Sequence, residues 1–254
     1  MKHPAARSRI PHFLRWGGRA GNVEKRNYLF IPGMSRSGTS WVAHWLAERR
    51  DLVAVHETYL IRYAFDMLHH QPAAGRLVSR ERARSFLHQA YADHAGGCPW
   101  LLDKSPGEFL YDGVPVHDVI RELFPEAFIL WLYRDGKDFV YGLLHLPWKA
   151  RTAWNARTAT DYWIRETRPL LEVQPHPRMM IMRYEDLLAA PRRSRQISEF
   201  LGLGHHADIR PWAKPVNTRY QAYEAGRWKS LDAESLEEMK RMNPLLVQCG
   251  YDPV

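Results

Sequence analysis

The chain has 254 residues, enough to bury one sizeable hydrophobic core, and its 45% apolar and 25% charged residues are ordinary for a globular domain. A net charge of +8 favours anionic partners, such as nucleic acid, a membrane surface or a polyanionic small molecule, without choosing among them. Two cysteines, Cys98 and Cys249, are too few for a disulfide framework, and no apolar run approaches the ~20 residues of a membrane span. We therefore expect a cytoplasmic protein with reduced thiols.

Basic residues dominate the first 26 positions, where Glu24 is the only carboxylate. This segment lacks the apolar centre of a secretory signal, so we interpret it as a loosely ordered basic N-terminal arm. A transit peptide and a contact to an acidic partner are the alternatives. No internal repeat, low-complexity tract or linker divides the rest of the chain, which predicts a single domain over residues 27–254.

Five short apolar runs alternate with segments of helical periodicity along the chain. This order predicts an α/β fold, a three-layer sandwich in which helices cover both faces of a mostly parallel central sheet. The predicted strands are 28–32, 51–57, 100–103, 127–133 and 178–183. The predicted helices are 41–47, 58–70, 78–93, 114–124, 138–146, 152–172, 191–201 and 231–249, with 202–223 mostly loop.

A Gly-rich loop, Gly33-Met-Ser-Arg-Ser-Gly-Thr-Ser40, joins the first strand to the first helix. Backbone N–H groups of such a loop and of the helix N-terminus point at one anion. The spacing of Gly33 and Gly38 nearly matches the P-loop pattern G-x-x-x-x-G-K-[ST], but Thr39 stands where the phosphate-binding Lys should be, which disfavours ATP hydrolysis. The predicted site instead grips a 5′-phosphate, with Arg36 beside the leaving oxygen. Its expected contacts are Ser35, Arg36, Ser37, Gly38, Thr39 and Ser40.

Polar residues also follow three other predicted strands: the pair His56-Glu57, the pair Asp103-Lys104, and Arg134. Ligands of an open parallel sheet bind beyond the carboxyl ends of the strands, so these residues converge on the loop. Taken alone, each has an ordinary alternative. Glu57 could cap a helix, bind Mg²⁺ or act as a base, and Lys104 could be a solvated surface lysine.

Several segments, in this order, resemble those of sulfotransferases that use 3′-phosphoadenosine 5′-phosphosulfate (PAPS). They are the Gly-rich loop, Arg134-Asp-Gly-Lys137, Arg183-Tyr-Glu-Asp-Leu187, Lys214-Pro-Val-Asn217 and the C-terminal Cys249-Gly-Tyr-Asp-Pro253. The motifs look most similar to those of tyrosylprotein sulfotransferases and soluble bacterial sulfotransferases. The resemblance implies the P-loop-like sulfotransferase fold, PAPS as co-substrate with the bisphosphate PAP as product, and no metal.

The resemblance also implies roles for individual residues. Glu57 would be the general base, with His56 as its rival, while Arg36 and Lys104 would stabilise the transferring group. Arg134 would bind the 3′-phosphate, although the serine that the family places eight residues later is Gly142 here. The remaining expected contacts to the nucleotide are Tyr184, Lys214, Asn217, Arg227 and Lys229.

The expected acceptor is a hydroxyl group on a small molecule, lipid, sugar or peptide tyrosine. Asp208 stands where the family's late loop has a serine, so a small hydroxylated acceptor is favoured over protein tyrosine. Residues 59–94 and 147–163 hold many aromatics and are expected to wall the acceptor pocket. The oligomeric state is left open, with a homodimer as one alternative.

Two other functions are weighed against sulfuryl transfer. A small-molecule kinase using ATP and Mg²⁺, with Asp103 as the metal ligand, is disfavoured by Thr39. A non-catalytic nucleic-acid binder would rest on the charge and the ten tryptophans, but these are scattered through helical patterns as core residues are.

Overall fold

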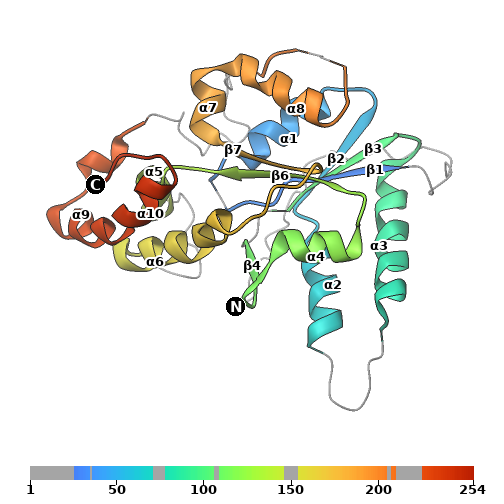
Figure 1. Ribbon diagram of the computed structural model, residues 1–254, viewed down its shortest axis with the longest axis horizontal. Helices are drawn as coiled ribbons and strands as arrows, with labels where there is room; N and C mark the ends of the chain where they lie inside the picture. Colours follow the sequence, from blue (N-terminus) through green and yellow to red (C-terminus); the bar gives the residue numbers. More distant parts are fainter. Residues whose placement is uncertain are drawn as a thin grey trace, which may run out of the picture.

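A computed structural model describes residues 26–34, 36–70, 78–105, 109–145, 154–204, 207–209 and 225–254. A five-stranded sheet in the order β2-β3-β1-β6-β7 forms the centre of this part of the chain (Figure 1). All neighbouring pairs are parallel, as predicted. The strands are β1 (Asn27–Phe30), β2 (Leu52–His56), β3 (Trp100–Lys104), β6 (Phe128–Tyr133) and β7 (Met179–Arg183).

Helices cover both faces of the sheet, which confirms the predicted three-layer α/β architecture (Figure 1). On one face lie α1 (Thr39–Ala47), α7 (Tyr184–Ala189) and α8 (Ser194–Phe200). On the other lie α2 (Leu60–His69), α3 (Arg80–Ala95) and α4 (Val116–Leu123).

The central strand β1 shows how the sequence builds two cores. Tyr28 and Phe30 pack with α2, α3 and α4, whereas Leu29 and Ile31 pack with α1 and α8. Successive side chains of a strand point to opposite faces, so an uninterrupted apolar run fills both layers at once.

A third core lies beside the carboxyl ends of β6 and β7, where α5 (Gly136–Leu144) and α6 (Ala156–Thr167) pack against the C-terminal helices (Figure 1). Trp131 and Trp163 are fully buried there, together with Met242. The helices α9 (Ala233–Met239) and α10 (Asn243–Gln248) thus anchor the end of the chain next to α5.

The structure corrects the two longest helix predictions. The predicted helix 231–249 is broken into α9, the 3-10 turn η5 (Lys240–Met242) and α10, whose first turn contains Pro244. Proline lacks the N–H that a continuous helix would need at this point, so the break is local chemistry. The predicted helix 152–172 is α6, which starts at the capping box of Asn155, followed by the 3-10 turn η2 (Arg168–Leu171) around Pro169.

The sequence did not predict α7 or the hairpin of β4 (Leu110–Tyr111) and β5 (Val114–Pro115). The predicted helix 114–124 is therefore wrong at its start, because α4 begins only after β5. The hairpin turns at Asp112 and Gly113, whose φ angles of 50° and 86° suit an Asp-Gly turn. Predicted strand limits agree with the observed ones within two residues at each end. The 3-10 turns η3 (Pro191–Arg193) and η4 (Arg227–Ser230) complete the described elements.

Both cysteines are free thiols, as predicted, with Cys249 buried. Among the helices that the structure describes, none combines the length and apolar character needed to cross a bilayer.

Substitution of two glycines of α5 by alanine should change the stability of the protein in opposite directions. A Cβ at Gly136 would lie 2.7 Å from Met242 Sδ and 2.8 Å from the Trp163 ring, whereas one at Gly142 would lie 3.6 Å from Arg36 Nε, an ordinary contact. We expect Gly136→Ala to lower the free energy of unfolding by roughly 1–3 kcal/mol through overpacking. Gly142→Ala should raise it by about 0.5–1 kcal/mol, because glycine disfavours a helix interior. Urea unfolding measures both, and equal effects would contradict the packing described.

Candidate active site

The carboxyl ends of β1, β2 and β3 meet at one level of the sheet. His56 lies opposite Lys104 in the register of β2 and β3, and Phe30 lies opposite Asp103 in that of β1 and β3. The segments that follow these strands therefore face a common region, as the sequence predicts.

The Gly-rich loop after β1 (residues 33–40) has a backbone conformation suited to binding an anion, and it is called the cradle below. Arg36 and Gly38 adopt positive φ angles of 74° and 83°. A Cβ at Gly38 would lie 2.1 Å from the Tyr184 ring, so only glycine fits at this point. The helix α1 begins at the next residue without a side-chain cap or an acidic residue in its first turn, which leaves its N-terminal N–H groups to bind an anion.

Two hydroxyl groups belong to this cradle. Ser37 is fully buried, and its Oγ has no hydrogen-bond partner among the described residues, while Thr39 is also buried. A buried hydroxyl without a partner is costly, and a phosphate oxygen would satisfy it. These residues therefore fit an anion, as does half-buried Ser40. Ser35 lies outside the described residues.

Arg134 and Tyr184 brace the cradle from the neighbouring strands. Arg134 donates a hydrogen bond of 2.8 Å from Nη1 to the carbonyl oxygen of Arg36. Its guanidinium lies 5.3 Å from the centroid of the Tyr184 ring, which in turn covers Gly38. The structure thus brings four predicted site residues together. The sequence predicted that Arg134 would lie near the loop, but not its hydrogen bond to the backbone of Arg36.

Gly142 faces the same arginine. A Cβ there would be 3.6–4.0 Å from the Nε, Cγ and Cβ atoms of Arg36. Gly142 stands where the resembling family has a serine. The space next to Gly142 is occupied by the Arg36 side chain.

Glu57 and Lys104 form an ion pair at the ends of β2 and β3. Glu57 Oε1 lies 3.3 Å from Lys104 Nζ, and the side chains are 58% and 4% exposed. The backbone N–H of Glu57 also donates to the Lys104 carbonyl oxygen at 2.8 Å. Burial lowers the pKa of the Lys104 ammonium, and the Glu57 carboxylate opposes that shift. An exposed carboxylate thus stands beside a buried cation.

The turn that carries Glu57 is strained. Glu57 and Tyr59 have φ angles of 57° and 54°, a conformation that bulky residues adopt only when their surroundings impose it. The N–H of Tyr59 donates to Ser105 Oγ at 3.2 Å, and Thr58 Oγ1 donates to Asp103 Oδ2 at 2.7 Å. Hydrogen bonds to β3 and to the residue after it therefore hold the turn in place.

Asp103 is the centre of these hydrogen bonds. It is 1% exposed, and its carboxylate also accepts from the hydroxyls of Tyr91 and Ser105. Burial raises its pKa, while the hydroxyl donors and Lys104 act in the opposite direction. Because protein hydroxyls occupy both of its oxygens, Asp103 is poorly suited to hold Mg²⁺, which weakens the kinase alternative.

A second histidine lies at the site. The rings of His44 and His56 stack with centroids 4.8 Å apart. Burial lowers the pKa of His56 to about 4, with further contributions from His44 and Lys104, and burial also lowers that of His44. Both imidazoles are therefore neutral at pH 7. The sequence indicated His56 as a rival base but did not show that His44 would lie against it.

The end of the chain ties the ends of β6 and β7 together. Tyr251 donates to Glu185 Oε2 at 2.8 Å, while Glu185 Oε1 accepts from the N–H of Asp135 at 3.1 Å. Lys137 donates from Nζ to the carbonyl oxygen of Asp252, and burial raises the pKa of Asp135 to about 6. The C-terminal segment thus supports the Arg-Asp-Gly-Lys turn that carries Arg134.

Arg227 and Lys229, two of the expected nucleotide contacts, lie on η4 beside the start of α5. The N–H of Gly226 donates to Asp138 Oδ1 at 3.2 Å. The ammonium groups of Lys137 and Lys229 lie 5.3 and 5.8 Å from the centroid of the Trp228 ring. The nucleotide roles of Arg227 and Lys229 stay predictions. Lys214 and Asn217 lie outside the described residues.

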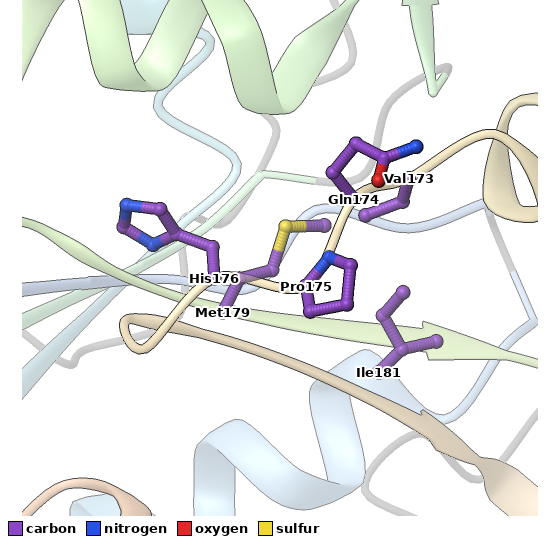
Figure 2. Close-up of a pocket in the computed structure, with 6 residues that line it drawn as sticks. All are labelled: Val173, Gln174, Pro175, His176, Met179 and Ile181. Carbon is purple, nitrogen blue, oxygen red and sulfur yellow. The ribbon is translucent and has the colours of Figure 1, made fainter.

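Two other features lie apart from this site. A cavity of about 240 Å³ is lined by residues 173–176, Met179 and Ile181, at the amino end of β7 (Figure 2).

Asp66, His70 and Asp112 lie close enough together to suggest metal ligands, but Arg62 already contacts both carboxylates, at 3.0 and 3.4 Å. The absence of a metal from the active site stays a prediction.

Comparisons with known proteins agree with this architecture. Three solved structures have similar folds: a sulfotransferase domain from the Synechococcus PCC 7002 olefin synthase, one from the curacin biosynthetic pathway, and a sulfotransferase from Alicyclobacillus acidocaldarius. Their identities to this chain are 16%, 15% and 15%, with TM-scores of 0.58, 0.59 and 0.58. The matches cover 94%, 90% and 89% of this chain and 100%, 99% and 97% of theirs.

A sequence model of the sulfotransferase family matches residues 29–207, from β1 to beyond α8. This match spans most of the chain and includes the cradle, Glu57, Lys104, Arg134 and Tyr184. The chain therefore belongs to the sulfotransferase family.

Proposed function

We propose that this protein transfers a sulfuryl group from PAPS to a hydroxyl acceptor, with Glu57 as general base. The observation that carries the proposal is the pairing of the exposed Glu57 carboxylate with the buried Lys104 ammonium, 3.3 Å apart, at the strand ends beside the cradle. A base and an oxyanion-stabilising cation at adjacent strand ends are what sulfuryl transfer to an alcohol needs.

The cradle fits the 5′ side of such a donor. The loop N–H groups and the Ser37 hydroxyl would hold the 5′-phosphate, with Arg36 beside the oxygen that bridges phosphorus and sulfur. Arg134, and with it Arg227 and Lys229, would bind the 3′-phosphate, and Tyr184 would contact the adenosine. When bound, PAPS supplies the activated sulfuryl group and the leaving oxygen.

The chain's own groups then handle the proton and the developing charge. As the acceptor oxygen forms its bond to sulfur and the bridging oxygen–sulfur bond breaks, Glu57 takes the hydroxyl proton and Lys104 donates N–H bonds to the sulfuryl oxygens. Lys104 is only 4% exposed, so its charge acts at low local dielectric and needs little reorganisation.

Asp103 and Thr58 would position the base. Thr58 is adjacent to Glu57, and its hydroxyl bonds to the buried Asp103 carboxylate at 2.7 Å. Neither group is placed to touch the substrates in this proposal. Their effect is to hold Glu57 in its left-handed conformation beside Lys104.

A small hydroxylated acceptor is favoured over a peptide tyrosine. Asp208, at the position where the resembling family has a serine, forms an ion pair of 3.0 Å with Arg195. A carboxylate held in this way offers no hydroxyl donor to the transferring group.

Replacement of Glu57 tests the base. Glu57→Gln keeps the size of the side chain but cannot accept the proton, so turnover should fall by ~10²-fold or more. Affinity for PAP, measured by calorimetry, should stay nearly unchanged, because the nucleotide contacts are elsewhere. Unchanged turnover would transfer the role of base to His56.

The same variant predicts a shift in the pH profile. Lys104 must be protonated to act, and burial already lowers its pKa, so its charge is lost at lower pH than for an ordinary lysine. The Glu57 carboxylate raises that pKa, and its removal lowers it further. The alkaline limb of the residual kcat/KM of Glu57→Gln should therefore move to lower pH than in the native enzyme. A limb that does not move would show that Lys104 is not the titrating group.

Thr58 gives a matched pair of variants for the positioning role. Thr58→Val removes the hydroxyl that bonds to Asp103, and kcat should fall by roughly 10-fold to 10²-fold through misplacement of Glu57. Thr58→Ser keeps the hydroxyl and should restore kcat, while both variants keep the native KM for PAPS. A loss of thermal stability in Thr58→Val with native kcat below the melting temperature would show a merely structural role.

A further inference from the structure

The peptide bond that joins Arg134 to Asp135 is held on both sides. Its carbonyl oxygen, on Arg134, accepts a hydrogen bond of 3.2 Å from Nε1 of Trp163, which is fully buried on α6. Its N–H, on Asp135, donates to Glu185 Oε1 at 3.1 Å. Because a peptide unit is planar, fixing both of its polar groups fixes the direction in which the backbone leaves Arg134. The Arg134 side chain then reaches the carbonyl oxygen of Arg36 in the cradle.

Glu185 joins this peptide to the other half of the nucleotide side. It directly follows Tyr184, the first residue of α7, and the Tyr184 ring centroid lies 5.3 Å from the Arg134 guanidinium. One carboxylate thus connects the turn after β6 with the first turn of α7. A shift of Glu185 would therefore change how Arg134 and Tyr184 lie relative to each other.

Tyr251, near the end of the chain, holds the second oxygen of Glu185. Its hydroxyl donates to Oε2 at 2.8 Å. Burial and the Glu185 carboxylate raise the pKa of the Tyr251 phenol, so the hydroxyl stays a proton donor at neutral pH. The Tyr251 ring is held as well, because the Arg183 guanidinium lies 5.3 Å from its centroid and the Tyr133 ring meets it edge-on with centroids 6.1 Å apart. Arg183 also donates to the carbonyl oxygen of Gly250 at 2.9 Å.

We propose that Glu185 and Tyr251 are positioning residues that set the preference of the site for a nucleotide with a 3′-phosphate. Neither residue touches the nucleotide in this assignment. Glu185 holds the peptide from which the Arg134 side chain projects, and Tyr251 holds Glu185. The guanidinium proposed to bind the 3′-phosphate therefore keeps one direction before the nucleotide arrives, which lowers the cost of binding. This inference rests on the proposed sulfuryl transfer from PAPS.

Removal of one hydroxyl tests the role of Tyr251. Tyr251→Phe keeps the ring and loses the bond to Glu185, so calorimetry should show PAP binding weakened by roughly 3- to 10-fold. AMP lacks the 3′-phosphate, and its affinity should change by less than about twofold. With PAPS as donor, KM should rise while kcat stays within about twofold, because the Glu57–Lys104 pair is unaffected. The matched control is Tyr28→Phe, which removes a hydroxyl bonded to a histidine at 2.9 Å in the core beside α3 and should keep the native affinity for PAP.

Variants of Glu185 separate positioning from a loss of packing. Glu185→Gln retains an oxygen for the Asp135 N–H and an amide that can donate to the Tyr251 hydroxyl, so it should keep the native preference for PAP over AMP. Glu185→Ala loses both bonds and should weaken PAP more than AMP. Because Tyr251 acts through Glu185, adding Tyr251→Phe to Glu185→Ala should weaken PAP no further.

Equal weakening of PAP and AMP in Tyr251→Phe, no weakening of either, or additive effects in the double variant would overturn the proposal. So would a Glu185→Gln variant that loses the preference for PAP. If Tyr251→Phe does not fold, hydrogen exchange in the native protein decides instead. Coupling is reciprocal, so PAP should slow exchange of the Asp135 amide several-fold more than AMP does at equal saturation, and equal protection would contradict the proposal. A native protein that does not bind PAP would overturn the donor assignment itself, which is a separate result.

Discussion

The buried carboxylate of Asp103 is the constraint on which the rest of the site depends. It is 1% exposed and lies one residue before Lys104 on β3. A carboxylate buried without hydrogen-bond donors is strongly destabilising, so its donors are fixed in place with it. These donors are the hydroxyls of Thr58, Tyr91 and Ser105. The network joins β3 to α3 and to the turn after β2, and it thereby places Glu57 against Lys104.

A second set of contacts organises the nucleotide side. Arg134 bonds to the backbone of Arg36 and lies over Tyr184, whose ring closes on Gly38. The C-terminal segment supports this arrangement, because Tyr251 and Asp252 bond to residues at the ends of β7 and β6. The cradle and the Glu57–Lys104 pair are thus both positioned from strand ends of one sheet.

Part of this arrangement could be predicted from the sequence, because it depends on local patterns. The apolar run of β6 indicates a central strand, and the spacing of Gly33 and Gly38 indicates an anion loop. The structure places Arg134 against Arg36 and Tyr184. It places Glu57 against Lys104, and both groups follow strands whose carboxyl ends lie at one edge of the sheet. The Asp-Gly turn of β4 and β5 was also present in the sequence but was not recognised as a hairpin.

Other features depend on contacts between distant segments. Tyr91 meets Asp103 only through the packing of α3, and His44 meets His56 only through the orientation of α1 on the sheet. The contact between Gly142 and Arg36 likewise requires α5 to lie over the loop. No local pattern encodes these pairings, so they follow from register and helix packing alone.

The central claim is that the loop after β1 holds a bisphosphorylated adenosine donor and not an ordinary adenine nucleotide. Calorimetric titration of the full chain with PAP, AMP and ATP tests this claim most directly. The account predicts that PAP binds clearly more tightly than AMP or ATP, and that Arg134→Ala removes most of the preference over AMP. Equal affinities for the three nucleotides in the native protein would contradict it.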